Sequence, residues 1–404
     1  MTELTQLLKE KSRIVLYLIL PLLFTNTAFA REKPLAVVQS LFDPVELVLT
    51  NYHIPFKVIT LRDLEKQETL DTYRAIYFPC GMEPPLHTRI NLLSQGTTIK
   101  SVSLKKDDYD ENIKKIAHNI ERFVNNGGSA YFSGYAFKFL QEAYAPFDFF
   151  DNFPYMGIPA RIEAVMKNDL AKFCLKNEMA IYITHTGWVA VKKARDAEII
   201  AEASYETPRG GRSGPISMLM KRGSGEILYT SYHSTLFSDF RRFNIYRIAG
   251  GHLLKKLEDQ AGKWEQYISG RIVDALLQGE TSRMYRLPLS PGNNTIYFIS
   301  EKEPCQIDIL DSGLSIIESR DSFDTDQSFD IKGGDNTFCF IRVFPSTTAR
   351  HGMFGIISAE GSRIIPHFLK IALGLAMLAG IILFLVFSRI IDGRKYSIRR
   401  RRFS

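Results

Sequence analysis

The stretch AYFSGYAF, residues 130–137, has the pattern of a site that holds a nucleophile. An apolar run ends at Ser133-Gly134, and a helix-like run, Tyr135–Leu140, follows directly. A strand, a sharp turn and a helix in this order form a nucleophile elbow, which presents its central residue to a substrate. A serine there attacks only with a base beside it and an acid that orients the base. Ser133 is therefore the first candidate for covalent chemistry, and it needs partners elsewhere in the chain.

Two further residues of suitable chemical type fall at the ends of predicted strands. His233 follows the strand Glu226–Tyr232 and is a candidate base, and Cys80 follows an earlier strand and offers a thiol. Each also has a structural interpretation: a hydrogen-bonded histidine, and a packed or disulfide-bonded cysteine. Ser133 has one as well, since Tyr131 stands where Gly-x-Ser-x-Gly elbows need a small residue, and its hydroxyl then only stabilises a turn.

The elements that must position these residues alternate between strands and helices. One amphipathic stretch, Asp110–Asn126, predicts a helix. Short apolar runs predict strands over Pro34–Ser40, Phe56–Leu61, Arg74–Pro79 and Ser129–Phe132. This alternation indicates an α/β domain with a flavodoxin-like parallel sheet, to which residues 157–232 add a β-rich segment. Sites gather at the carboxyl ends of such strands, so the predicted ligand-binding residues are Cys80, Gly81, Gly134, Tyr135 and His233.

The same order of elements resembles a known superfamily. A strand ends in Pro-x-Gly at 79–81, a helix ends in Asn-Gly-Gly at 126–128, the elbow follows, and GSGEILYTSYH forms a late strand at 223–233. Over residues 34–255 the chain is similar to the class I glutamine amidotransferase-like superfamily, nearest to its trehalose-utilisation-like branch.

The resemblance also implies which residues carry the chemistry in active members. These have a cysteine at the elbow and a histidine followed two residues later by glutamate. His233 matches the histidine, but the elbow reads Ser133-Gly134-Tyr135 and Thr235 replaces the glutamate. We therefore expect an amidotransferase-like domain over residues 31–255 that lacks amidotransferase chemistry.

From Arg283 onward the sequence changes to an alternation of apolar and polar residues. Seven short runs, separated by turn residues, predict strands between residues 283 and 362. Strands at this spacing indicate a small all-β sandwich, similar to the pre-peptidase C-terminal-type domain of exported proteins. Residues 256–282 are helical in character and are predicted to link the two domains.

Two of the four cysteines alternate in phase with apolar residues of these predicted strands. Cys305 is in phase with Ile307, and Cys339 with Ile341, so both thiols are expected to face the apolar side. A Cys305–Cys339 disulfide would stabilise the domain by about 3–4 kcal/mol through the loop that it closes. Two buried free thiols are the alternative.

Both ends of the chain have the composition of membrane-related segments. Basic residues, an apolar run and the cleavage pattern Ala28-Phe29-Ala30 predict a signal peptide over residues 1–30. Residues 366–388 are almost without charge and predict one transmembrane helix. The arginine-rich segment 389–404 then predicts a cytoplasmic tail. The expected location is the cell membrane, with a single pass and a periplasmic, extracytoplasmic body.

The formal net charge of +7 lies at the ends of the chain. The first thirty residues carry +1 and the last sixteen carry +6, which leaves the body neutral. A neutral body argues against nucleic-acid binding. Because no CxxC or Cys/His spacing typical of a metal site occurs, we expect neither a metal nor another cofactor.

These patterns together predict a membrane-anchored, extracytoplasmic binding or assembly protein with a catalytically degenerate amidotransferase-like domain. Its expected partners are the membrane and a protein of the cell envelope. The alternative is a cell-envelope hydrolase that uses His233 with Ser133 or Cys80.

Overall fold

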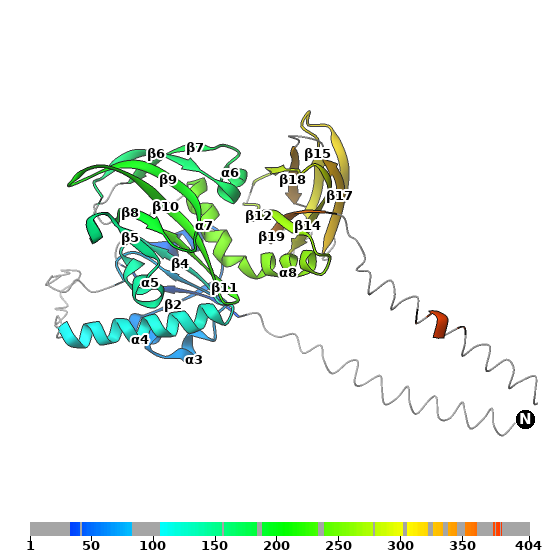
Figure 1. Ribbon diagram of the computed structural model, residues 1–404. Helices are drawn as coiled ribbons and strands as arrows, with labels where there is room; N and C mark the ends of the chain where they lie inside the picture. Colours follow the sequence, from blue (N-terminus) through cyan, green and yellow to red (C-terminus); the bar gives the residue numbers. More distant parts are fainter. Residues whose placement is uncertain are drawn as a thin grey trace, which may run out of the picture.

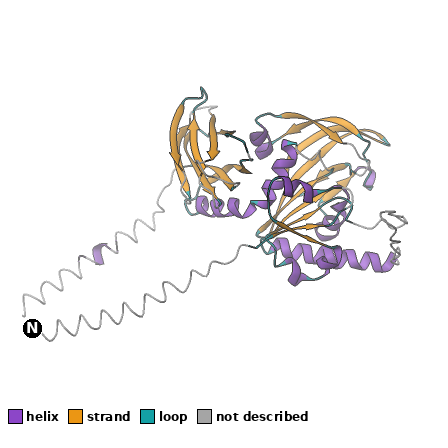
Figure 2. Ribbon diagram, turned by 180° about the vertical axis from the view of Figure 1, so that it is seen from behind, coloured by secondary structure: helices purple, strands orange, loops and turns teal. Residues whose placement is uncertain are grey.

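The computed structural model describes residues 33–40, 43–82, 106–155, 157–183, 188–232, 238–277, 279–301, 305–321, 326–333, 338–345 and 352–361, with 375, 377–379 and 381. Within these ranges the chain forms two β-rich units with helices between them (Figures 1 and 2).

A single nine-stranded sheet organises the first unit (Figure 1). Five neighbouring strands run parallel, in the order β2 (Phe56–Ile59), β1 (Leu35–Val38), β3 (Ala75–Phe78), β4 (Ser129–Ser133) and β11 (Gly225–Thr230). The sheet continues in antiparallel register through β10 (Gly210–Arg222), β9 (Glu198–Thr207), β6 (Ala160–Met166) and β7 (Glu178–Ile183). The short strands β5 (Phe147–Phe149) and β8 (Val191–Ala194) pair separately.

Both faces of the central parallel strands β1, β3 and β4 are buried, and successive side chains point to opposite sides. Ala36 and Val38 join one core, which is covered by α3 (Gln67–Leu70), α4 (Lys106–Asn125) and α5 (Phe137–Tyr144). Leu35 and Val37 join the other core, which is covered by α2 (Val45–Asn51), α7 (Asp239–Ala249) and α8 (Gly251–Gly262). Helices on both faces hold the strand ends in fixed positions.

Two four-stranded antiparallel sheets form the second unit, a β-sandwich-like domain. One sheet has the order β12 (Tyr267–Ala275), β19 (Met353–Glu360), β14 (Gly292–Ser300) and β17 (Gln327–Gly333). The other has the order β13 (Arg283–Pro288), β18 (Phe338–Pro345), β15 (Cys305–Leu310) and β16 (Ile316–Asp321). Tyr285 and Phe354 pack edge to face between the sheets, with ring centres 6.0 Å apart.

A buried ionic network fixes the two units to each other. Asp274 of β12 is fully buried, and its two carboxylate oxygens lie 2.8 Å from Arg242 Nε of α7 and 2.9 Å from Arg283 Nε of β13. Tyr285 also donates a hydrogen bond to Asp274, at 2.6 Å. Because helix α8 packs on β12, β14 and β19 as well, the junction is a continuous part of the core.

The predicted fold class needs correction in its sheet. Residues 157–232 do not form an added segment beside a parallel sheet, because four of their strands extend the same sheet as antiparallel neighbours. A tight turn at Gly223-Ser224 returns the chain from β10 to β11, so these two strands must pair in opposite directions. The predicted helical linker, residues 256–282, divides into the end of α8 and the strand β12.

The predicted membrane span is also contradicted. In the ranges described above, no helix has both the length and the apolar character needed to cross a bilayer. The single C-terminal span, the membrane partner and the single-pass location with a periplasmic body therefore lose their support. Nearly all of residues 366–388, together with the predicted signal peptide 1–30 and tail 389–404, lies outside the described residues.

All four cysteines are described, and none of them forms a disulfide bond. Cys305 and Cys339 are both buried in the sandwich, as their phase predicts. Cys305 lies opposite Pro345 of β18, six positions along that strand from Cys339, which is roughly 20 Å at the usual rise per residue. The disulfide alternative is therefore wrong in this structure, because the side chains lie at different levels of the sheet.

Candidate functional site

The carboxyl ends of the parallel strands bring the predicted elbow and Cys80 together. The register pairs Phe78 of β3 with Phe132 of β4, so Cys80 and Ser133 follow at the same level of the sheet. β4 is also paired with β11, and Thr230 lies opposite Ser133. Cys80 and Ser133, which are 53 positions apart in the sequence, are thus neighbours.

Ser133 is hydrogen-bonded both as a donor and as an acceptor. Its hydroxyl donates to Asp43 Oδ2 at 2.5 Å, and its oxygen accepts a hydrogen bond from the backbone N–H of Cys80 at 2.9 Å. The side chain is completely buried. A nucleophile needs an accessible oxygen and a base positioned to take its proton. In this geometry the proton points at a carboxylate and the oxygen is enclosed, so Ser133 fastens the β4 turn to its neighbours.

Asp43 belongs to a buried ion pair with Arg241 of α7. The carboxylate lies 2.5 Å from one guanidinium nitrogen and 3.5 Å from another, and the two side chains are 1% and 0% exposed. Arg241 also donates to the hydroxyl of Tyr131 at 3.3 Å. Burial opposes the charge of Arg241, but Asp43 and Tyr131 together raise its pKa above the ordinary value. The charge of Asp43 is therefore already balanced inside the protein.

The hydroxyl of Tyr131 completes the network beneath the elbow. It lies 3.0 Å from the hydroxyl of Thr230 at the end of β11. Burial raises the pKa of Tyr131 to about 12, so the phenol stays neutral and acts through its hydrogen bonds. We call Asp43, Ser133, Arg241, Tyr131 and Thr230 the strand-end network.

Ser133 has an extended backbone (φ −127°, ψ 145°), so the left-handed residue of this turn is the glycine that follows it. Gly134 has φ +50° and Gly81 has φ +85°, a region that glycine enters without steric cost. The hydroxyl of Tyr229 donates to the carbonyl of Gly134 at 3.1 Å. Burial, and then the nearby Cys80, raises the pKa of Tyr135 to about 12. The thiol of Cys80 is only 4% exposed. Neither Ser133 nor Cys80, the two possible nucleophiles, is presented to solvent.

His233, the predicted base, lies in the segment 233–237 outside the described residues, as does Thr235. The predicted pairs Ser133–His233 and Cys80–His233 are therefore not placed. Among the described residues, no group of three histidine, cysteine or acidic side chains lies close enough to hold a metal ion.

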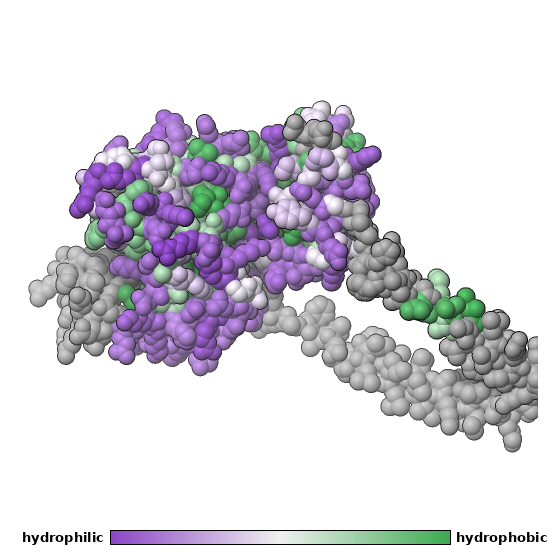
Figure 3. Space-filling view, in the orientation of Figure 1, coloured by the Kyte–Doolittle hydropathy of each residue, from purple (hydrophilic) through white to green (hydrophobic). Residues whose placement is uncertain are grey.

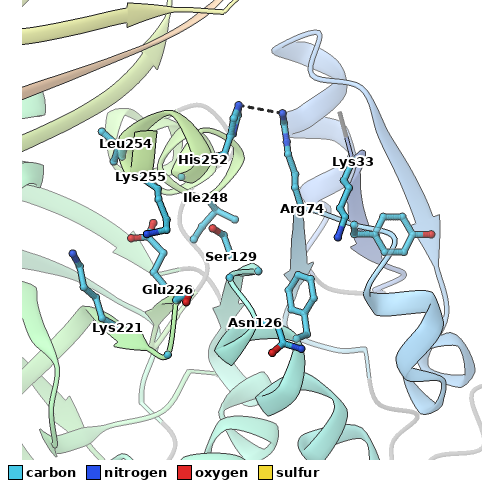
Figure 4. A pocket seen from close by; sticks show the side chains of 18 of the residues that line it. Lys33, Arg74, Asn126, Ser129, Lys221, Glu226, Ile248, His252, Leu254 and Lys255 are labelled. Atoms are coloured by element: carbon cyan, nitrogen blue, oxygen red, sulfur yellow. Dashed lines mark hydrogen bonds between the residues drawn. The ribbon is translucent and has the colours of Figure 1, made fainter. Parts of the chain in front are cut away.

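A cavity of about 410 Å³ opens at the other edge of the sheet, where the parallel strands begin (Figure 4). It lies among the starts of β3, β4 and β11 and the first turns of α8. Figure 4 shows Arg74 and His252 pointing toward each other across it, with 3.5 Å between their nearest nitrogens. Its other charged groups are largely matched within the protein, by the pairs Arg74–Glu301, Glu226–Arg247 and Lys221–Glu258. Sequence analysis did not predict this cavity.

Sequence analysis also missed Asp43 and Arg241, the charged pair of the strand-end network. One signal was present: α7, DFRRFNIYRIA, has apolar residues on all sides and yet contains arginines. A buried arginine requires an acidic partner, but nothing in the sequence says which acid supplies it.

Comparisons with known proteins do not identify the chain. No protein-family model matches the sequence, those of the glutamine amidotransferases included, and no curated protein matches it. A β-galactosidase from Bacillus circulans sp. alkalophilus is 13% identical with a TM-score of 0.30, over 77% of this chain and 41% of that chain. The chain thus spans less than half of that enzyme.

Two smaller proteins match shorter parts of the chain. Cytoplasmic protein STM1381 from Salmonella typhimurium LT2 is 12% identical with a TM-score of 0.33, over 56% of this chain and 98% of that chain. The pre-peptidase C-terminal domain of a collagenase from Bacillus anthracis is 13% identical with a TM-score of 0.19, over 22% of this chain and 86% of that chain. None of these similarities is strong enough to carry an argument about function.

Proposed function

We propose that this protein is a binding or assembly protein whose first unit is a catalytically degenerate, amidotransferase-like domain. The observation that carries the proposal is the state of Ser133. Its proton is directed at Asp43, its oxygen accepts from Cys80 N–H, and its surface is fully buried. An elbow in this state positions strands and offers no nucleophile.

The sequence around the elbow supports the same conclusion. The residues of active amidotransferases are absent from both positions that the resemblance identifies, since Ser133-Gly134-Tyr135 contains no cysteine and Thr235 is not glutamate. The ion pair between Asp43 and Arg241 adds a physical reason. The carboxylate of Asp43 is already paired with the guanidinium of Arg241, so it serves the ion pair and not a catalytic base.

The alternative is a hydrolase that uses His233 with Ser133 or Cys80. For Ser133 to act, its hydrogen bond to Asp43 must break and the strand-end network must open to solvent. Cys80 would need exposure of a thiol that is 4% exposed in the structure. Both steps cost free energy that the binding role does not require, so the binding role is favoured.

Active-site labelling separates the two functions. The native protein, Ser133→Ala and Cys80→Ser are treated with a serine-directed fluorophosphonate probe and, separately, with an iodoacetamide probe. We expect labelling of native Ser133 and Cys80 to be no faster than that of other buried side chains. Rapid labelling of the native protein that is lost in either variant would overturn the proposal and favour the hydrolase.

The binding role itself is tested by crosslinking in cells that produce the full-length protein or its His233→Ala variant. We expect the same set of crosslinked partners from both proteins, because a binding surface does not depend on a catalytic histidine. A partner or small molecule trapped only by His233→Ala would indicate turnover and would contradict the proposal.

A further inference from the structure

A groove runs between the two units, along α6 (Asn168–Cys174) and the segment that ends β13 and leads into β14. Its volume is about 1310 Å³, and it is lined by the end of α6, the segment 286–291 and Phe338 of β18. Figure 1 places α6 beside the sandwich. Pockets for small molecules usually measure about 300–1,000 Å³, so this groove has the size to take a longer segment of chain.

The charges along this groove have one sign. Its lining includes Lys172, Lys176 and Arg286, and none of the described lining residues is acidic. Lys172 is already matched, since its Nζ lies 3.3 Å from Asp169 and donates to the carbonyl of Ser269 at 2.6 Å. Lys176 and Arg286 are exposed and form no ion pair with any residue that the structure describes. Two positive charges therefore remain for a ligand.

The guanidinium of Arg286 is stacked on an aromatic ring. Its carbon lies 3.9 Å from the centre of the Phe338 ring, which is a cation–π contact. A guanidinium edge binds a carboxylate through two parallel hydrogen bonds. Such a stacked arginine loses little freedom when it binds.

Apolar side chains line the same groove as the two positive charges. Leu175, at the end of α6, is 46% exposed, and Pro288 and Pro291 are also exposed along the groove. The visible face in Figure 3 is mostly hydrophilic, with hydrophobic side chains in small groups. A partner for this groove therefore needs both acidic and apolar groups.

The groove is rigid before anything binds, because α6 is fixed to the sandwich. Asp169 is 3% exposed and accepts a hydrogen bond from the backbone N–H of Arg271 at 3.0 Å. Arg283 lies over the ring of Phe173, 4.9 Å from its centre, and Phe173 also contacts Tyr285. A preformed groove avoids part of the ordering cost of association.

We propose that this groove binds an acidic segment of a partner protein, in which carboxylates contact Lys176 and Arg286 and apolar side chains contact Leu175 and Phe338. The inference rests on the proposed binding role and names the chemistry of the partner. It does not use the strand-end network, so its failure would leave the labelling experiment at Ser133 unaffected.

The test measures fluorescence anisotropy of a short fluorescein-labelled peptide rich in glutamate and leucine, added to the full-length protein. We expect saturable binding that weakens with added salt. The double variant Lys176→Glu/Arg286→Glu should bind at least about tenfold more weakly, which corresponds to ~1.4 kcal/mol. The same peptide with lysine in place of glutamate should not bind the native protein.

A matched control is Lys57→Glu/Lys192→Glu, which makes the same change in net charge at two exposed lysines outside the groove. It should bind the peptide within about twofold of the native protein, because distant surface charges are screened. Thermal unfolding of each variant checks that it is folded.

Three results would overturn the proposal. The first is no binding of the acidic peptide by the native protein, and the second is an equal loss of binding in the two double variants. The third is tighter binding of single-stranded RNA or of anionic vesicles, with the same dependence on Lys176 and Arg286, which would assign the groove to a different class of partner.

Discussion

Ser133 donates its hydroxyl proton directly to Asp43, across 2.5 Å and 90 positions of sequence. In a catalytic triad an imidazole stands between the serine and the acid, takes the proton and is oriented by the carboxylate. Here the acid is in the position that the imidazole would occupy. The same contact joins the loop after β1 to the end of β4, so the relationship stabilises the fold.

Removing the hydroxyl of Ser133 should therefore affect stability. Ser133→Ala leaves Cys80 N–H without its acceptor and removes one hydrogen bond from Asp43. We expect the free energy of unfolding to fall by about 1–3 kcal/mol, the cost of leaving a buried polar group unsatisfied. Urea unfolding measures this change. Ser204→Ala, at an exposed position of β9, is the control and should change stability little. Equal stability of Ser133→Ala and the native protein would contradict the described geometry.

Breaking the ion pair between Asp43 and Arg241 should lower the free energy of unfolding more than Ser133→Ala does. Asp43→Asn leaves the guanidinium of Arg241 buried without its counter-charge, and we expect a loss of about 3–5 kcal/mol. The double variant Asp43→Leu/Arg241→Met removes both charges and should be more stable than Asp43→Asn, since well-packed apolar residues can replace a buried pair. Urea unfolding of the two variants and the native protein provides the comparison. A double variant that was no more stable than Asp43→Asn would contradict this coupling of the two side chains.

Much of the local structure could be predicted from the sequence, because the side chains that a strand or helix buries recur at a fixed spacing within a short segment. The predicted strand Arg74–Pro79 contains β3. The predicted helix Asp110–Asn126 lies within α4 except for its last residue. The elbow at Ser133-Gly134 was visible because its left-handed turn needs glycine. These features depend on residues that are close together in the chain.

The remaining features depend on residues that are far apart. Asp43 and Arg241 are separated by 198 positions, and either could have met another charge. The antiparallel extension of the sheet was missed for the same reason, since an apolar strand can pair with a neighbour in either direction. Cys305 and Cys339 both face the apolar side, as a disulfide would require. The register of β15 against β18, which places Cys305 opposite Pro345, depends on the packing of the whole sandwich.

Glu258 of α8 should make stability depend on acidity. It contacts Arg271 of β12 and lies 3.4 Å from Lys221. Burial opposes its charge, but Arg271 and Lys221 outweigh burial and lower the pKa of Glu258 below its usual 4.5. The folded protein thus holds this proton less tightly than the unfolded chain. The stabilisation is present above pH 4.5 and is lost as the pH falls through the lowered pKa.

Comparison of the native protein with Glu258→Gln measures that contribution. At neutral pH we expect the variant to unfold with about 1.5–3 kcal/mol less free energy, the range for hydrogen bonds to charged groups. The difference should shrink as the pH is lowered below 4.5, in urea unfolding at a series of pH values. Asp259→Asn is the control, because Asp259 is 61% exposed and pairs only with Lys255 on the helix surface. A difference that stays constant with pH would mean that Glu258 is not charged in the folded state.

The cysteines provide a direct test of the sandwich. Because none of the four forms a disulfide bond in the structure, all four thiols should react with Ellman's reagent in urea without any reductant. In the native protein the reaction should be slow, since burial raises the pKa of Cys174 and of Cys339 to about 12 and leaves little thiolate at neutral pH.

The variant Cys339→Ser distinguishes two thiols from a Cys305–Cys339 disulfide. With free thiols the variant gives one thiol fewer than the native protein, whereas with a Cys305–Cys339 bridge it gives one more, because Cys305 is released. A higher count in the variant would show that β15 and β18 pair at a different level from the one described.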